Sequence, residues 1–177
     1  FFSEHLTPYD PYLQDLTIAK QAPSAEHLLG TDRYGRDMLS RVIAGSRASI
    51  FSTLLLVALT AILGTAVGVL CGWVGGMTDT VLMRVSDVFL AFPGLVFALA
   101  VAGTLGGGLQ NAMIALAAIS WPKYARIARS QTLAQKETQW MKAVRLSGSG
   151  TGKIILKHIL PNILGPILVT SMLDIGT

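Results

Sequence analysis

The sequence predicts an all-α protein that crosses a lipid bilayer several times, and three observations lead to this fold class. The 177-residue chain is 51% hydrophobic and only 14% charged, with a mean hydropathy of +0.55. Soluble domains carry about 25% charged residues. The charges are also clustered, which leaves 48–78, 88–122 and 158–173 without Lys, Arg, Asp or Glu. One spanning helix needs roughly 20 apolar residues. The run 48–78 is therefore long enough for one span, and the run 88–122 is long enough for two. A large soluble helical core is excluded, because its helices would carry alternating charged faces.

Residues 1–36 are expected to form an extracytoplasmic segment outside the membrane. Prolines interrupt helices here, and up to residue 31 four acidic residues face a single lysine, Lys20. Residues 37–49 then place apolar side chains at helical spacing between the basic residues Arg41 and Arg47. This pattern predicts a short interfacial helix that leads into the bilayer.

The first span is expected from about Ile50 to Val74. It carries Gly64, Gly68 and Gly72 at four-residue intervals, so all three lie on one helix face. Small residues at this spacing allow another helix to approach closely. Glycines that are merely tolerated in a membrane helix are the alternative, and we predict a helix-packing face. Trp73 is expected to be an interfacial anchor.

The second span is expected over 81–104, after a short loop. Arg84 and Asp87 lie three residues apart in its first two turns, where they can pair on one helix face. An ion pair at the membrane boundary is the prediction, because arginine can reach the headgroups from there; a substrate site is the alternative. Pro93 is expected to kink or start this helix.

The third span is expected over 109–127, is rich in alanine and ends in basic residues. Eight of the fourteen Lys and Arg fall between positions 123 and 157, against the single acid Glu137. Cytoplasmic loops carry such an excess, which places 136–162 inside and the N-terminal segment outside. The asymmetry reports membrane topology and gives no support for nucleic-acid binding. A fourth span begins near Ile163, and the chain is expected to be a fragment of a longer protein.

The loop 136–162 has a helix–glycine–helix pattern. Trp140, Met141, Val144 and, less directly, Ala143 lie on one face of a short helix, and Lys142 and Arg145 lie off it. Three glycines between 148 and 152 break the helix, and a second apolar stripe follows and ends at Pro161. Such a helix can insert into a partner's groove or lie on the membrane. Headgroup binding by the basic residues is the alternative, but it gives no reason for the glycine break. We predict that the loop docks a partner.

Chemistry within the chain is not indicated. The stretch SGSGTGKI from Ser147 to Ile154 resembles a phosphate-binding loop but lacks its first glycine and its Ser/Thr magnesium ligand. The histidines His5, His27 and His158 are far apart, which does not predict a metal site. The lone Cys71 cannot form an internal disulfide. With no nucleophile–base pair and no paired carboxylates, the sequence predicts no catalytic residue.

Two long stretches resemble a known family. HLLGTDRYGRDMLSRVIAGSRASI, residues 27–50, resembles the GTDxxGRDxxSRxxxGxRxS stretch of permease subunits of dipeptide/oligopeptide/nickel ABC importers. KAVRLSGSGTGKIILKHILPN, residues 142–162, resembles the EAA loop through which such permeases contact their ATPase subunits. The resemblance covers nearly the whole chain. It assigns the ATPase contact to these loop residues: Trp140, Met141, Lys142, Ala143, Val144, Arg145, Leu146, Gly148, Leu160 and Pro161. The EAA triplet falls on 142–144, so a lysine replaces the family's glutamate, and a contact that depends on that charge does not carry over.

The resemblance implies a type I ABC importer permease fold with six spans. Residues 50–177 would form part of its permease domain, and the first and last spans would be missing from this chain. The resemblance also implies a second permease subunit, ATP-binding subunits that hold ATP and Mg on the cytoplasmic side, and an extracytoplasmic solute-binding protein. The location would be the cytoplasmic (inner) membrane of a bacterium or archaeon. This chain would bind no cofactor of its own. Peptide, nickel and nickel chelate all stay open as substrates. A channel or secondary transporter is the alternative function, but it would carry ionisable residues deep in its spans. A membrane-anchored enzyme would need a polar catalytic domain.

Overall fold

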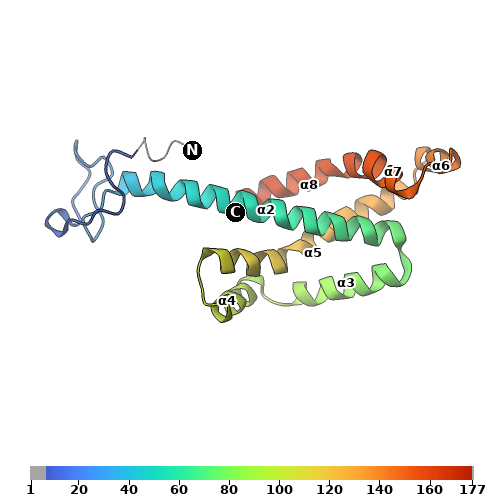
Figure 1. The fold of residues 1–177 in the computed structure, drawn as a ribbon, viewed down its shortest axis with the longest axis horizontal. Coiled ribbons are helices and arrows are strands. Elements are labelled where there is room, and N and C mark those ends of the chain that lie inside the picture. The colour runs from blue at the N-terminus through green and yellow to red at the C-terminus, as the bar shows by residue number, and fades with distance from the viewer. Residues whose placement is uncertain (1–6, 177) are drawn as a thin grey trace. The chain divides into compact units, whose positions relative to one another are not determined.

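The computed structural model describes residues 7–176, and within them the regular elements are helices (Figure 1). The all-α class is therefore confirmed. Residue His5 and the first part of the predicted 1–36 segment lie outside the described residues. The elements in chain order are η1 (Leu16–Ile18), α2 (Met38–Val74), α3 (Gly76–Ala91), α4 (Gly94–Thr104), α5 (Leu109–Lys136), α6 (Gln139–Leu146), α7 (Thr151–Ile154), the π-helical turn η2 (Ile155–Ile159) and α8 (Leu160–Ile175).

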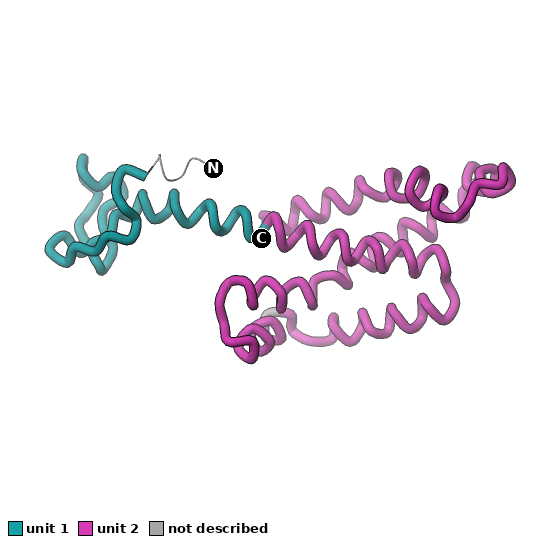
Figure 2. The backbone as a smooth tube through the Cα atoms, in the orientation of Figure 1, with its two compact units in different colours: residues 1–53 teal, residues 54–177 magenta. Residues whose placement is uncertain are grey.

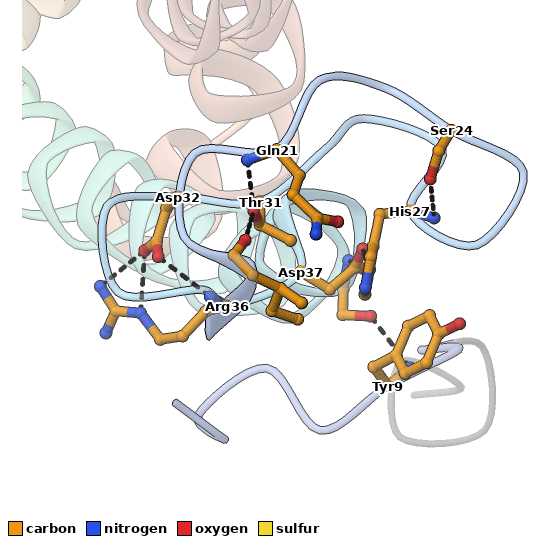
Figure 3. Close-up of polar contacts among 10 residues, drawn as sticks. Tyr9, Gln21, Ser24, His27, Thr31, Asp32, Arg36 and Asp37 are labelled. Atoms are coloured by element: carbon orange, nitrogen blue, oxygen red, sulfur yellow. Dashed lines mark hydrogen bonds and ion pairs between the residues drawn. The ribbon is translucent and has the colours of Figure 1, made fainter. Parts of the chain in front are cut away.

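The chain divides into two compact units, Phe1–Thr53 and Leu54–Thr177 (Figure 2). In the first unit, polar side chains fix an irregular loop (Figure 3). Asp32 accepts hydrogen bonds from the backbone N–H groups of Tyr34 (2.8 Å) and Arg36 (3.0 Å) and pairs with the Arg36 guanidinium (2.8 Å). Burial alone would raise the pKa of Asp32, but these donors outweigh it and hold the pKa well below its usual range.

The first unit also caps α2. Asp37 precedes the helix and accepts a hydrogen bond from the backbone N–H of Ser40 (2.7 Å), which satisfies one of the free donors of the first turn. Its other carboxylate oxygen lies 3.0 Å from Nδ1 of His27, whose ring packs 4.8 Å from that of Tyr9. Burial would raise the pKa of Asp37, but the bonds from Ser40 and His27 lower it below its ordinary value. The loop and the helix start are therefore one folded piece.

Helix α2 runs without a break through its 37 residues, or about 56 Å at 1.5 Å per residue. This length exceeds the roughly 30 Å of the hydrocarbon core. The predicted boundary near Ile50, between an interfacial helix over 37–49 and a first span, is thus not a break in the helix. The physical reason is that no proline interrupts the segment, and Gly45, its one glycine before Ile50, has helical backbone geometry.

The predicted second span, 81–104, is not one straight helix. Helices α3 and α4 meet at an angle of 93° across a short break. Pro93 is the N-cap of α4, as expected for a residue that lacks an N–H and excludes the helical conformation before it. The kink at Pro93 is confirmed, and the bent pair α3–α4 is one candidate for the predicted span.

Among residues 7–176, two helices are long and apolar enough to cross a membrane, α2 and the continuous helix Thr151–Ile175, with the bent pair α3–α4 as a third candidate. The predicted third span lies in α5, which extends to Lys136 and is not among these candidates. Its apolar stretch is short, because Gln110 and Asn111 stand at its start and basic residues follow from Lys123.

In the second unit, α5 packs against α3, α4 and α8. The glycines Gly64, Gly68 and Gly72 of α2 also lie against α5. A Cβ atom on Gly64 would stand 2.5 Å from the backbone oxygen of Trp121, and on Gly68 and Gly72 it would stand 2.7 Å from the Cβ atoms of Ala128 and Thr132. Side chains larger than hydrogen do not fit at this spacing.

Ion pairs join α5 to its neighbours. Arg129 makes a bidentate pair with Asp79 of α3. Asp87 has Arg126 at 2.5 Å, whereas Arg84, its predicted partner, lies at 4.0 Å. The predicted Arg84–Asp87 pair is therefore the weaker of two, because α5 brings a closer guanidinium from far along the chain.

Candidate functional site

One face of helix α6 packs against the rest of the second unit. Met141 is fully buried (0% exposed) in a cluster with Ile154, Ile159 and Ile163, and Val144 packs against the same cluster. Trp140, predicted on the same apolar face, is 37% exposed, and its ring lies 5.9 Å from the ring of His158. Neighbouring residues on a helix are about 100° apart, which explains why Trp140 lies beside the buried face and not on it.

A second attachment is a cluster of cations around Trp73. The Arg145 guanidinium lies 4.7 Å from the centre of the Trp73 ring, a cation–π contact from α6 to the end of α2. Lys136 lies 5.7 Å from the same ring and donates to the backbone oxygens of Gly72 (3.1 Å) and Trp73 (2.8 Å). These bonds satisfy carbonyls that the helix end leaves free. Sequence reasoning missed this cluster, since Lys136 and Arg145 lie more than 60 residues from Trp73 along the chain and carry no local signal.

Gly148 ends α6 by its backbone conformation. Its φ is +76°, in the left-handed region that favours glycine, and its N–H donates to the carbonyl oxygen of Arg145 at 3.1 Å. Gly150 has an ordinary extended conformation as the N-cap of α7, and Gly152 is helical. Only the first of the three glycines is therefore required by conformation. The helix–glycine–helix pattern is present as the sequence predicts.

The second apolar stripe does not end at Pro161. It continues into α8 as one helix, Thr151–Ile175, so the predicted start near Ile163 lies inside it. A π-helical turn joins the two parts: the N–H of Leu160 donates to the carbonyl oxygen of Ile155, five residues back. Pro161 has no N–H to offer the carbonyl of Lys157, as an α-helix would require.

The π turn sets which side chains are buried. The inward residues of this helix are Ile154, Ile159, Ile163 and Ile167, one step of five followed by two steps of four. In an α-helix a five-residue step would rotate the side chain by about 140° out of line. The wider turn over 155–159 absorbs the extra residue and keeps all four on one face.

The outer side of the loop carries an exposed surface with basic and apolar side chains. Leu146 is 89% exposed and Leu156 is 67% exposed. Around them, the exposed residues are Lys142, Ala143, Arg145, Gly148, Lys153, Lys157 and Pro161, with Leu160 half-buried. We call Lys142, Ala143, Leu146, Lys153 and Leu156 the loop tip. Within 7–176 no group of three or more His, Cys, Asp and Glu gathers in one place. The chemistry of the loop tip suits binding to another molecule.

Comparison with known proteins decides the family. Residues 64–177 match the family model described as "Binding-protein-dependent transport system inner membrane component". The chain belongs to this family. The family expected from the two sequence stretches is thus confirmed, and with its candidate spanning helices the chain is a multi-pass membrane protein.

Curated relatives agree with this assignment. The chain is 42% identical over 176 residues to the probable D,D-dipeptide transport system permease protein DdpC of Escherichia coli (strain K12), covering 99% of the chain and 59% of the relative. It is 38% identical over 174 residues to the nickel transport system permease protein NikC of the same strain (98% and 63%). It is 36% identical over 178 residues to the glutathione transport system permease protein GsiD of Pectobacterium atrosepticum (99% and 59%). The chain spans about three fifths of the length of these relatives.

Proposed function

We propose that this chain forms part of the transmembrane pathway of an ATP-driven importer for peptides or nickel, free or chelated. The names of its relatives support this role, since they are permease proteins of dipeptide, nickel and glutathione transport systems. A second permease subunit and an extracytoplasmic solute-binding protein complete the importer in the cytoplasmic membrane of a bacterium or archaeon. ATP and Mg belong to separate ATPase subunits, and this chain is a non-catalytic subunit.

In this proposal α6 is the coupling element, and the observation that carries it is the two-sided character of the helix. Its inner side is fixed by Met141 and by Arg145 on Trp73, while Leu146 projects almost fully exposed. An ATPase that moves α6 therefore moves the core cluster, and with it α5 and α8. Nucleotide drives this change only if the contact between α6 and the ATPase differs between the two states.

Leu146 is the centre of the proposed contact. A leucine that is 89% exposed beside lysines suits a partner with an apolar pocket and an acidic rim. Lys142 replaces the glutamate of the family pattern, so the partner's surface opposite this position would be acidic or neutral and not basic.

Co-purification tests the proposal. The full-length parent protein is purified with its candidate ATPase, intact and as Leu146→Glu, with Met77→Glu as the matched control. Met77 is also strongly exposed (78%) but follows α2 and lies outside the loop. A central apolar contact contributes about 2 kcal/mol or more, so Leu146→Glu should weaken ATPase binding by at least thirtyfold while Met77→Glu retains it. If both variants retain the ATPase equally, the ATPase-binding surface lies elsewhere on the protein. If the intact protein binds no ATPase, the importer proposal is refuted and the alternative function, a channel or secondary transporter, is favoured.

A further inference from the structure

The first compact unit carries an exposed apolar surface that the proposed coupling does not use. Tyr12, Leu13 and Leu16 are 79%, 67% and 71% exposed and lie within a stretch of five residues. We call these three side chains the N-terminal apolar surface. Their backbone is irregular apart from the short turn η1. Irregular backbone does not face the hydrocarbon of a bilayer, because its N–H and C=O groups would have no partners there. Lipid chains therefore do not explain the exposure, and neighbouring apolar side chains of this size indicate a binding surface.

Hydrogen bonds on both sides hold the N-terminal apolar surface in place. Before it, the N–H of Tyr9 donates to the hydroxyl of Ser40, in the first turn of α2, at 3.1 Å. After it, the N–H of Gln21 donates to the hydroxyl of Thr31 at 2.9 Å, and the N–H of Thr31 donates to the carbonyl oxygen of Gln21 at 3.1 Å (Figure 3). A surface that is already fixed loses little conformational entropy when a partner binds.

Acidic side chains border the N-terminal apolar surface. Exposed Asp10, Asp15 and Glu26 outnumber the single lysine, Lys20, in this part of the chain. Hydrogen bonds from the hydroxyl and the backbone N–H of Thr17 hold the pKa of Asp15 below its ordinary value, so this carboxylate stays charged. A surface of this charge repels anionic lipid headgroups and attracts a protein whose contact face is basic.

The family to which the chain belongs indicates which protein this is, since its members serve transport systems that depend on a binding protein. We infer that the N-terminal apolar surface is the contact through which this chain docks the extracytoplasmic binding protein, which meets it with an apolar groove bordered by lysine or arginine side chains. The inference rests on the proposed importer function and on the predicted position of residues 1–36 outside the membrane. Tyr12 is the central anchor, because tyrosine is enriched among the residues that dominate binding energy.

A binding titration on the assembled importer tests this contact. The full-length parent, with its second permease subunit and its ATPase, is held in lipid nanodiscs, and its affinity for the purified binding protein of the same importer is measured. Tyr12→Ala and Leu16→Ala should each weaken the affinity at least fivefold, equivalent to about 1 kcal/mol. Met77→Ala is the matched control and should keep the affinity of the parent, because Met77 is as exposed as Tyr12 but belongs to α3.

The acidic border gives a second readout. Replacing both Asp10 and Asp15 by Asn removes two charges and keeps the side-chain oxygens that accept the local backbone hydrogen bonds. This double variant should associate with the binding protein severalfold more slowly than the parent at low salt, and its association rate should depend less on salt, because salt screens the attraction between charges. Equal rates and equal salt dependence in the two proteins would contradict the basic contact face.

A polarity-sensitive fluorophore at Leu13→Cys identifies what covers the surface. The parent for this experiment has no other reactive cysteine, and Cys71 is buried. The emission should shift to the blue only when the binding protein is added. A shift that precedes this addition and grows with the anionic lipid content of the nanodisc would assign the surface to the membrane. A shift that precedes it at every lipid composition would assign the surface to another part of the importer. Either result would overturn the inference.

Failure of this inference differs from failure of the proposed function. Unchanged affinity in both Tyr12→Ala and Leu16→Ala would overturn the docking surface, while ATP-driven uptake by the parent would keep the importer. A parent that binds neither an ATPase nor a binding protein would refute both. If Tyr12→Ala or Leu16→Ala unfolds at a lower temperature than the parent, Leu13→Ser carries the same comparison of affinities.

Discussion

The packing of α2 on α5 predicts that a glycine-to-alanine substitution in α2 changes stability in opposite directions at two positions, Gly68 and Gly45. Gly68→Ala places a methyl group 2.7 Å from the Cβ of Ala128 and 2.9 Å from the backbone nitrogen of Arg129. Backbone atoms of a helix cannot move away singly, so the two helices must separate. Overpacking of this kind costs about 1–3 kcal/mol. Gly45→Ala is the matched control, since nothing lies within 4 Å of its added Cβ.

The control should stabilise the protein, because alanine loses less backbone entropy than glycine on entering a helix, by about 0.5–1 kcal/mol. The two variants should therefore differ by about 1.5–4 kcal/mol. Thermal unfolding of the purified full-length parent in detergent measures this, at one scan rate because such proteins unfold irreversibly. At about 3 °C per kcal/mol, Gly68→Ala should melt about 5–12 °C below Gly45→Ala. Equal midpoints, or a more stable Gly68→Ala, would refute the close approach of α2 and α5.

Three further predictions concern the loop and the helix start. Gly148→Ala forces a side chain into a positive φ and should lower stability by about 1–2 kcal/mol. Gly152→Ala is the control and should be neutral or stabilising. Equal unfolding temperatures of the two variants in a thermal-shift assay would contradict the left-handed cap. Deleting the exposed Leu156 should convert the π turn into a regular α-helix without loss of the folded state, and a collapse of hydrogen-exchange protection in α8 would show that the turn does not absorb the extra residue. Asp37 has a lowered folded pKa, so its contribution is complete above its ordinary value of 3.8 and is lost as the pH falls through the folded value. Asp37→Asn should therefore weaken exchange protection at the start of α2 at neutral pH and make it less sensitive to acid. An equal loss in both proteins as the pH falls below 3.8 would contradict the cap.

Sequence reasoning predicts those features of this fold that depend on near neighbours in the chain. The gaps between charges indicate spanning helices, the four-residue spacing of glycines from Gly64 to Gly72 shows where α2 can approach another helix, and Pro93 marks the bend between α3 and α4. In each case the signal is a residue type whose backbone or size limits the local structure.

Contacts between distant segments leave no such signal. Arg145 and Trp73 meet because α6 folds back on the end of α2, and Lys123 meets Asp174 because α5 and α8 lie side by side. The predicted interfacial helix and first span belong to one helix for a related reason: the basic residues before Ile50 change the surface of α2 and not its backbone. The π turn left no signal in the sequence, since Ile155, Ile159, Ile163 and Ile167 follow each other at an unbroken four-residue spacing, and only the burial of Ile154 shows the step of five.

The central claim, that α6 docks the ATPase, is tested most directly by a photo-reactive amino acid in place of Leu146. The residue is introduced into the full-length parent in its native membrane and irradiated with the importer assembled. The account predicts a cross-linked product whose mass is that of the permease plus one ATPase subunit. Products with lipid alone would contradict it and would make the loop a headgroup-binding element.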